Sequence, residues 1–419
     1  MSKYTEKFDT SIKPKKHSRF WHAVENVGGA FLLMPVGAKI TKVNCEGLKP
    51  PYIILGNHAS MVDFSMMLKG TRPYPISWVC SIEEFIGREY FFRQMGMIYK
   101  RKFTNDITVV RHIFHVLKNN KGIVGIYPEA RFSLAGINER LDDALGKLVK
   151  KAGVPVVTFM QDGNFLRSPQ WNKHPYRKVK VSAVMTQIVN KEETETLSAE
   201  EIQKRIEEKF VYDEYRRQAD EKIQIKSKER ATNIHKILYQ CKHCKKEFST
   251  YSKGTKIWCQ ECGSVWDMDY YGKLICENGE HKGEETFVSD WYRWERQNVR
   301  EEVRSGNYKF EDTARVEILQ STKNGFMPIG TVKLTHDENG FTMDGDLDNG
   351  EHFTFNRPCE TMISCHIEYD YKGRGDAIDL CTLKDTYFVF PLTAVNCLTK
   401  IHFATEELYY YIMETRHSK

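Results

Sequence analysis

Asn57-His58-Ala59-Ser60-Met61-Val62-Asp63 is the most informative stretch of the chain, because it joins a candidate general base to a carboxylate that can orient it. It follows the apolar run 51–56, which predicts a buried strand stopped by a glycine. Residues five apart do not share a helix face, so His58 is expected just before a helix and Asp63 in its first turns. A carboxylate that holds one imidazole nitrogen leaves the other to take a proton, as a general base must. The alternative is an ordinary strand-to-helix turn with a capping asparagine.

Two further apolar runs extend this pattern. The run 122–127 leads into Pro128-Glu129-Ala130-Arg131-Phe132-Ser133, and a third run covers residues 154–159 after an amphipathic stretch. Strands that alternate with helical periodicity predict an α/β domain in which helices flank a sheet and sites gather at the strand ends. His58 and Glu129 both follow the end of a predicted strand.

Together these motifs resemble the glycerolipid acyltransferase family of bacterial 1-acylglycerol-3-phosphate acyltransferases. That family carries an Asn-His-x4-Asp motif, an arginine-bearing second motif, a Pro-Glu-Gly-Thr-Arg-Ser-like third motif and an apolar fourth motif with Val-Pro. The resemblance covers roughly residues 20–210, with order and spacing kept. The third motif departs from the pattern, because the glycine is absent and Arg131 stands one position early, while Glu129 and Ser133 stay in register.

The resemblance implies a role for each matching residue. His58 is the expected catalytic base, and Asp63 is the carboxylate that fixes its tautomer. The expected substrate-binding residues are Asn57, Arg101, Glu129, Arg131 and Ser133. Arg101 is the candidate for an acceptor phosphate, because a guanidinium binds phosphate bidentately. The alternative for Arg101 is a solvated basic turn.

The implied reaction moves a fatty acyl group from an acyl thioester, on coenzyme A or acyl carrier protein, to the hydroxyl of a lysophospholipid. The expected acceptor is 1-acyl-sn-glycerol-3-phosphate, which gives phosphatidic acid in phospholipid biosynthesis. The altered third motif weakens this choice of acceptor more than it weakens acyl transfer. The alternatives are a different acceptor, or a non-catalytic membrane-peripheral binding protein on the same fold. The reaction needs no metal ion.

Composition bounds the class of protein. A chain of 419 residues predicts two or three domains. The net charge of +6 suits an anionic membrane surface or phosphorylated substrates, and nucleic acid is not an expected partner. Eleven cysteines with no apolar signal-peptide core at the start indicate reduced thiols in a cytoplasm. No run reaches the roughly eighteen apolar residues that span a bilayer, so we expect a cytoplasmic protein that is peripheral on the inner face of the membrane.

The N-terminal arm has the pattern of an interfacial membrane anchor. Its basic residues are Lys13, Lys15, Lys16 and Arg19, and Phe20-Trp21 and the apolar run 30–34 follow them. Basic residues attract anionic lipid, and aromatic and apolar residues enter the interface. The alternative is a helix that packs on its own domain behind a solvated basic lead.

Cys241-Lys242-His243-Cys244 and Cys259-Gln260-Glu261-Cys262 are two Cys-x-x-Cys pairs. Four thiolates at this spacing fit a structural Zn²⁺, and the spacing resembles the zinc ribbon family. The alternative is a pair of redox dithiols. His243 is expected to be exposed rather than metal-bound, and the module to serve as a structural spacer or to dock a protein partner.

The sequence therefore predicts four segments. They are an acyltransferase domain with its arm (1–212), a charged helical linker (213–235), a zinc ribbon (236–285) and a β-rich domain (286–419). Period-two alternation with Asp-Gly and Asn-Gly turns predicts antiparallel strands in the last segment, and residues 405–414 predict a closing helix. Strands closed by a helix look like a pleckstrin-homology-type barrel, whose partner would be a lipid headgroup or a protein.

Overall fold

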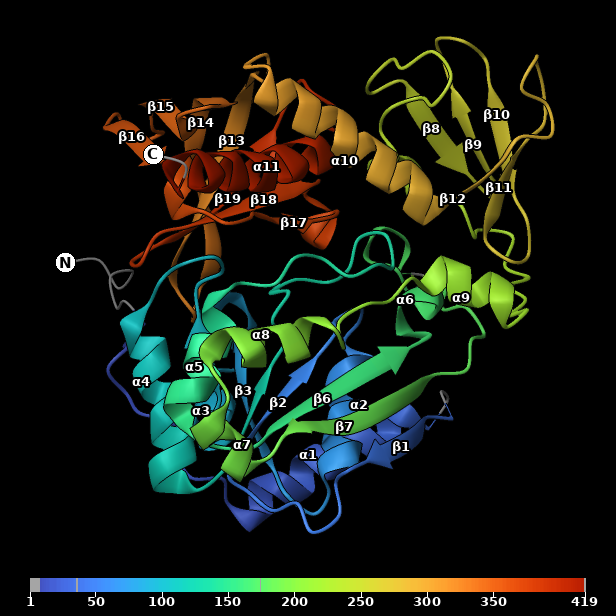
Figure 1. The fold of residues 1–419 in the computed structure, drawn as a ribbon. Helices are drawn as coiled ribbons and strands as arrows, with labels where there is room; N and C mark the ends of the chain where they lie inside the picture. The colour runs from blue at the N-terminus through green and yellow to red at the C-terminus, as the bar shows by residue number, and fades with distance from the viewer. Residues whose placement is uncertain (1–7, 35–36, 174, 418–419) are drawn as a thin grey trace. The chain divides into compact units, whose positions relative to one another are not determined.

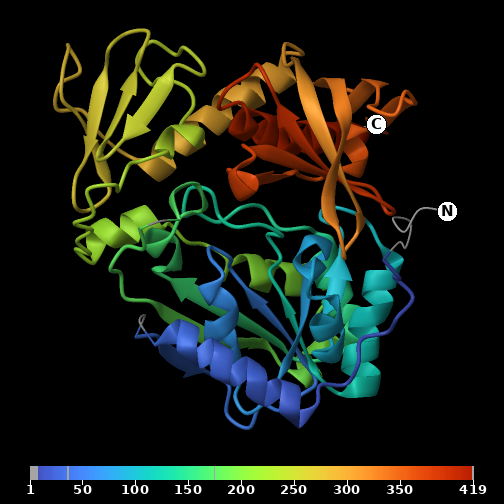
Figure 2. The same cartoon turned by 180° about the vertical axis from the view of Figure 1, so that it is seen from behind.

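The chain divides into two compact units (Figures 1 and 2). The computed structural model describes residues 8–34, 37–173 and 175–417. One unit comprises residues 8–100 and 106–214, and the other comprises residues 101–105 and 215–417. The first unit contains the described residues of the segment predicted as the acyltransferase domain, except residues 101–105, which group with the second unit. Residues 1–7, 35–36 and 174 of that segment lie outside the described part of the chain.

A seven-stranded sheet forms the centre of the first unit. Its strands are β1 (Lys39–Val43), β2 (Tyr52–Gly56), β3 (Ile76–Ser81), β4 (Ile98–Lys100), β5 (Ile123–Ile126), β6 (Val156–Asp162) and β7 (Ser182–Val189). In the order β1-β7-β6-β2-β5-β3-β4, each neighbouring pair is parallel except β6 and β7. The predicted α/β class is confirmed.

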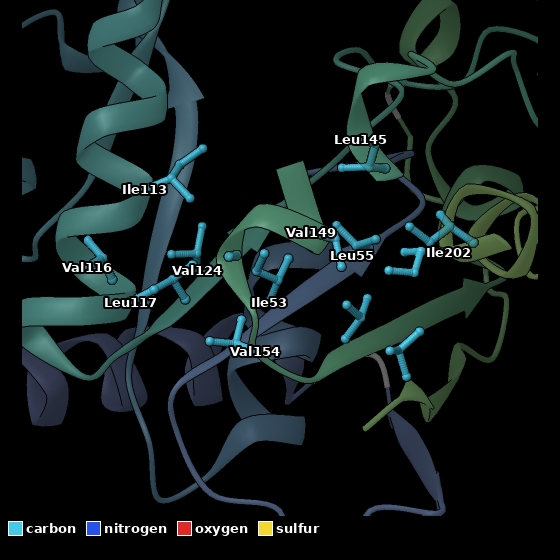
Figure 3. Packing of buried hydrophobic residues seen from close by; sticks show 14 of the residues in the cluster. Ile53, Leu55, Ile113, Val116, Leu117, Val124, Leu145, Val149, Val154 and Ile202 are labelled. Carbon is cyan, nitrogen blue, oxygen red and sulfur yellow. The ribbon is translucent and has the colours of Figure 1, made fainter. Parts of the chain in front are cut away.

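Helices cover both faces of this sheet, because successive side chains of a strand point to opposite faces. Ile53 and Leu55 of β2 pack with Val149 and Ile202 in one apolar cluster (Figure 3), while Ile54 packs with Met66 in the other. The first cluster holds α4 (Ile107–His115), α5 (Ala144–Ala152) and α8 (Ala199–Glu207), and the second holds α1 (Arg19–Leu33) and α2 (Val62–Thr71). The shorter helices are α3 (Glu89–Gln94), α6 (Asn164–Arg167) and α7 (Lys191–Thr196).

Among the residues described, no helix combines the length and the apolar character that crossing a bilayer requires.

The second unit contains a small antiparallel sheet that carries the cysteine pairs. After α9 (Glu214–Asp220), its strands are β8 (Thr250–Lys253), β9 (Lys256–Cys259), β10 (Val265–Met268), β11 (Lys273–Cys276) and β12 (Glu285–Phe287). They pair in the order β12-β11-β10-β9-β8.

A larger antiparallel sheet follows in the same unit. Its strands are β13 (Phe310–Ser321), β14 (Gly325–Asp337), β15 (Gly340–Asp346), β16 (His352–Arg357), β17 (His366–Glu368), β18 (Ala377–Cys381) and β19 (Thr386–Pro391), and α11 (Leu398–His417) comes last. Their order is β16-β15-β14-β13-β19-β18-β17. The predicted antiparallel strands and final helix are confirmed, and the identification as a pleckstrin-homology-type barrel stays a prediction.

One long helix, α10 (Val288–Arg304), is absent from the sequence-based expectations. Its Trp291 ring meets Trp266 of β10 edge to face at 4.8 Å. Farther along, Arg300 forms an ion pair with Glu407 of α11 at 2.7 Å. The helix therefore contacts both the small sheet and the last helix of its own unit.

Candidate functional site

His58 and Asp63 lie at the junction between β2 and α2. The imidazole Nδ1 is 2.9 Å from Asp63 Oδ2, so Nδ1–H donates to the carboxylate and Nε2 keeps its lone pair. The amides of Ala59 and Ser60 donate to the same oxygen at 2.6 and 2.8 Å. Asp63 is fully buried, whereas 11 % of the His58 side chain is exposed. The placement predicted from the five-residue spacing is confirmed.

Two residues near the end of β6 complete the surroundings of this pair. The Asn164 side chain donates to Asp63 Oδ1. Asn57 Nδ2 donates to the Gln161 carbonyl at 2.8 Å, and Asn57 Oδ1 accepts from the Gln161 amide at 2.7 Å. Asn57 therefore joins the ends of β2 and β6 through its side chain. Its predicted contact with substrate stays a prediction.

Aromatic rings surround the imidazole of His58. Tyr127, at the end of β5, stacks on it with centroids 4.0 Å apart and planes inclined by 13°. Phe132 lies at 4.2 Å and Phe64 meets the ring edge at 5.2 Å. These contacts restrict the rotamers of the base before substrate arrives, which lowers the entropic cost of reaching the reactive geometry.

The third motif contributes a buried carboxyl group rather than a solvated one. Glu129 Oε1 accepts from the Glu139 amide at 3.0 Å and from the Tyr212 hydroxyl at 2.9 Å. Burial raises the pKa of Glu129 to about 7, although these two donors act in the opposite direction. Sequence reasoning missed Tyr212, which lies 83 residues farther along the chain.

Ser133 connects the third motif to the first. Its amide donates to the His58 carbonyl at 2.7 Å, and its hydroxyl donates to the Ile137 carbonyl at 2.9 Å. Arg131 is buried, and its Nη2 lies 3.4 Å from Glu139 Oε2. The amides of Ala59, Ser60 and Ser133 near His58 therefore all donate to acceptors within the protein.

Ala130 adopts a left-handed backbone with φ of 56°. The glycerolipid acyltransferase family, which this sequence resembles, has glycine at this position of the third motif. Glycine adopts such a φ without steric cost. The turn is nevertheless closed in this chain by the Ala130 amide, which donates to the Tyr127 carbonyl at 3.0 Å.

Arg101 belongs to the segment 101–105, which groups with the second unit. Its Nη1 donates to the Leu383 carbonyl at 3.2 Å, and its buried Nε has no hydrogen-bond partner among the described residues. The other predicted substrate-binding residues lie in the first unit. The predicted phosphate contact of Arg101 stays a prediction.

The four predicted cysteine ligands come together in the second unit. Their sulfur atoms all lie within 4.8 Å of one another, with Cys241 Sγ 3.6 Å from Cys262 Sγ and Cys244 Sγ 3.7 Å from Cys259 Sγ. A tetrahedron with Zn–S bonds of about 2.3 Å has edges of about 3.8 Å. The donor set and its dimensions fit a Zn²⁺ ion. Burial raises the pKa of Cys262, but hydrogen bonds that include those from Ser264 outweigh it and bring the pKa to about 6.

His243 differs from its predicted exposure. Only 8 % of its side chain is exposed, because its ring packs on Trp266 at 4.6 Å and on His281 at 3.9 Å. Burial and the nearby His281 lower the pKa of His243. The exposure was predicted wrongly because the partners of this ring lie more than twenty residues away in the sequence.

Comparison with known proteins identifies part of the first unit. Residues 39–161, which include His58, Asp63 and the third motif, match the model of the family described as Acyltransferase. Among solved structures, the chain is similar to the 1-acyl-sn-glycerophosphate (LPA) acyltransferase PlsC from Thermotoga maritima, with 18 % identity and a TM-score of 0.37 over 45 % of this chain and 76 % of that chain. A search of curated proteins finds no match. The likeness to the Acyltransferase family therefore lies in residues 39–161 of the first unit.

Proposed function

We propose that this protein transfers a fatty acyl group from an acyl thioester to the hydroxyl of a lysophospholipid. The observation that carries the proposal is the His58–Asp63 pair, 2.9 Å apart, within the segment that matches the acyltransferase family. The donor is acyl-coenzyme A or acyl carrier protein, and the first candidate acceptor is 1-acyl-sn-glycerol-3-phosphate, with phosphatidic acid as the product.

The chemistry follows from the free Nε2 of His58. This nitrogen removes the proton of the acceptor hydroxyl, and the oxygen attacks the thioester carbonyl carbon. Asp63 stabilises the imidazolium that forms and holds its orientation. As the tetrahedral intermediate collapses, the carbon–sulfur bond breaks and the imidazolium returns its proton to the leaving thiolate. The ester and the free thiol are the products, and the base is regenerated.

Two arginine residues are the candidate ligands of the acceptor phosphate. Arg131, one predicted ligand, already faces the Glu139 carboxylate at 3.4 Å, so a phosphate would have to share or displace that contact. Arg101 retains an unpartnered buried Nε, as a phosphate ligand would. A panel of acceptors with and without a phosphomonoester tests whether acyl transfer depends on the phosphate of the acceptor.

The test uses the full-length protein with isotope-labelled acyl-coenzyme A and acyl carrier protein. The acceptors are lysophosphatidate, lysophosphatidylcholine, monoacylglycerol and glycerol 3-phosphate, and products are identified by mass spectrometry. We expect a phospholipid product with wild type and none with His58→Ala. Transfer to monoacylglycerol but not lysophosphatidate would change the acceptor class, and no product from any pair would favour the non-catalytic alternative.

We further propose that Cys241, Cys244, Cys259 and Cys262 hold a structural Zn²⁺, and that the protein associates with an anionic membrane surface through α1 and the basic residues before it. The ion would stabilise the small sheet by cross-linking two turns that have little core of their own. Its donor set is all thiolate, which is typical of a closed structural site. Such a site has no open coordination position for a substrate.

A further inference from the structure

Three side chains beside the four-cysteine cluster converge without an ordinary hydrogen bond between them. Glu284 Oε2 lies 3.5 Å from His243 Nε2 and 3.5 Å from His281 Nδ1. One ligand atom from each residue lies within 4.8 Å of the other two. For bonds of about 2.1 Å to nitrogen or oxygen, the edge of a coordination tetrahedron is about 3.4 Å. The two distances to Glu284 are therefore those between two ligands of one ion.

The nitrogen of His243 that does not face Glu284 has a hydrogen-bond partner of its own. Its Nδ1 lies 2.8 Å from Ser264 Oγ, which in turn lies 3.2 Å from Cys262 Sγ. When Cys262 is a thiolate, the Ser264 hydroxyl donates to the sulfur and its oxygen accepts from Nδ1–H. Nε2 then presents a lone pair, as metal-bound histidines do when an outer partner holds the other nitrogen. This step rests on the proposed zinc site.

The lone pair of His243 Nε2 has no partner in the described part of the chain. The side chain is 8 % exposed, and Nε2 is buried without a hydrogen bond. A carboxylate oxygen at 3.5 Å offers a second acceptor rather than a donor. Two acceptors that face each other repel, and a cation between them reverses the sign of the interaction.

The backbone fixes the loop that supplies the other two ligands. The Glu284 amide donates to the His281 carbonyl at 3.0 Å, and the Glu284 carbonyl accepts from the Cys276 amide at 2.9 Å. The His281 ring stacks on His243 with an angle of 24° between planes, so it must turn about its last side-chain bond to share an ion. Its side chain is 44 % exposed and has room to turn.

The surrounding charges favour a cation. Glu280 Oε1 lies 3.6 Å from His281 Nε2, which adds a second carboxylate to that of Glu284. Lys242 Nζ lies 3.9 Å from the other oxygen of Glu284 and partly offsets them. Imidazole together with carboxylate suits zinc-class ions, because harder cations prefer oxygen ligands alone.

We propose that His243, His281 and Glu284 bind a second divalent transition-metal ion, separate from the ion held by the four cysteines. Water would complete its coordination. The ion would fasten the loop before β12 to the first Cys-x-x-Cys turn.

The test counts metal ions in the full-length protein. After saturation with Zn²⁺, calorimetric titration and elemental analysis should give two ions per chain in wild type and one in His281→Ala or Glu284→Gln. Loss of one ligand should weaken the second ion at least as much as loss of an outer-shell partner, which costs about 10- to 100-fold in affinity. With Co²⁺, the second equivalent should add weak visible bands without the sulfur-to-metal charge transfer of the first.

His352→Ala is the matched control, because His352 is an exposed histidine that also lies beside two carboxylates, those of Asp344 and Asp346. It should leave two ions bound. The proposal is overturned if wild type binds one ion, or if a second ion persists unchanged in both ligand variants. An ion lost in Cys262→Ser but kept in His281→Ala supports the cysteine site alone. An ion lost in His281→Ala but kept in Cys262→Ser would support the site of His243, His281 and Glu284 and contradict the cysteine site.

Discussion

Asp63 accepts hydrogen bonds from four donors, which is more than a carboxylate needs for orienting one histidine. Besides His58 Nδ1, the donors are the amides of Ala59 and Ser60 and the side chain of Asn164. A buried carboxylate with this many donors keeps its orientation. The arrangement is therefore set before substrate binds, so little reorganisation is needed during the reaction.

His58→Ala should abolish acyl transfer without unfolding the first unit. Asp63 would keep three of its four donors, so the buried charge stays satisfied. The aromatic rings of Tyr127 and Phe132 would border the vacated space. Acyl transfer measured beside the thermal unfolding curve tests this, and His58→Gln, which fills more of the space, should be equally inactive. Full activity in either variant would contradict the catalytic assignment.

Asp63→Asn should impair transfer less than His58→Ala. Oδ2 faces two amide donors besides His58, so the asparagine oxygen must occupy that place and keep the histidine tautomer. The new NH₂ group would then face Asn164, whose own buried oxygen has no partner among the described residues and can accept after the amide turns over. The substitution would then remove only the negative charge of the Asp63 side chain. We expect a fall in turnover smaller than the roughly 10⁴-fold seen where an asparagine also imposes the wrong tautomer. A loss as complete as that of His58→Ala would contradict this account.

Glu129→Gln should remove a pH dependence of stability. The pKa of Glu129 is raised from 4.5 to about 7 by burial, so its contribution is fully present below about pH 4.5 and is lost as the pH rises through about 7. Over that window the variant should gain roughly 3 kcal/mol in free energy of unfolding relative to wild type, at about 1.4 kcal/mol per pKa unit. Denaturant titrations between pH 4.5 and 8 measure this difference. Glu208→Gln, at an exposed carboxyl, is the control and should show no such change.

The sequence predicted the residues of the site better than their contacts. The His58–Asp63 pair is local, and a spacing of five residues was enough to place it. Asn164, the partner of Asp63, lies 101 residues away in the sequence. Tyr212, the partner of Glu129, lies 83 residues away. No spacing rule reaches that far. Polar residues just after an apolar strand, such as Asn164, were the available signal, because parallel strands bring their ends together.

At the scale of elements, α1 packs on its own domain, as one of the two alternatives for the N-terminal arm predicted, and the membrane-anchor alternative stays a prediction. One side packs on α2, where Gly29 lies against Ser65 and Leu68 and Leu33 is buried. The other side exposes an apolar row of Phe20, Val24, Val27, Phe31 and Leu32. A helix that is docked on its domain and still exposes such a row suits the surface of a bilayer.

Replacing Val27 and Phe31 by serine should detach the protein from vesicles. These side chains are 72 % and 71 % exposed, so the domain should stay folded, and each contributes about 1.5–3 kcal/mol when it enters an apolar phase. Flotation with anionic vesicles measures binding, and Leu392→Ser with Val395→Ser, at exposed apolar residues of the other unit, is the control.

The basic residues before α1 set the lipid preference. Exchanging Lys13 and Lys16 for alanine should weaken binding to anionic vesicles by roughly tenfold or more, at about 1 kcal/mol per charge. Added salt should do the same in wild type. Equal flotation with neutral and anionic vesicles would contradict the electrostatic part, and unchanged flotation of the serine variant would contradict the role of α1.

The sequence predicted the elements in which apolar residues repeat with a clear period. The hairpin turns Asp337–Gly340 and Asp348–Gly350 connect β14 to β15 and β15 to β16, where the Asn-Gly pair of each turn predicted them. β18 was missed because all of it is buried, so it has no alternation to detect. α10 was missed although Trp291, Glu295 and Val299 repeat at helical spacing, because many charged residues on its other face hid the buried row.

At the scale of the whole molecule, the proposed zinc site and the proposed base belong to different units. The four cysteines lie within residues 215–417, and His58 and Asp63 lie within the unit that ends at Glu214. The first unit contains one sheet and the second contains two, and no sheet is shared, so the two units should respond to metal removal separately.

Metal removal should therefore change the stability of one unit and leave the chemical step of the other unchanged. A structural zinc contributes its binding energy to folding, about 10–16 kcal/mol in isolated zinc-finger peptides, so chelation or Cys262→Ser should lower the unfolding temperature of the second unit. Cys276→Ser, at a buried cysteine outside the four, is the matched control and should retain zinc.

The turnover number for acyl transfer should not change when the metal is removed. Loss of turnover at saturating acceptor after chelation would show that the cysteine site supports the chemistry itself, and the division of labour between the units would be wrong.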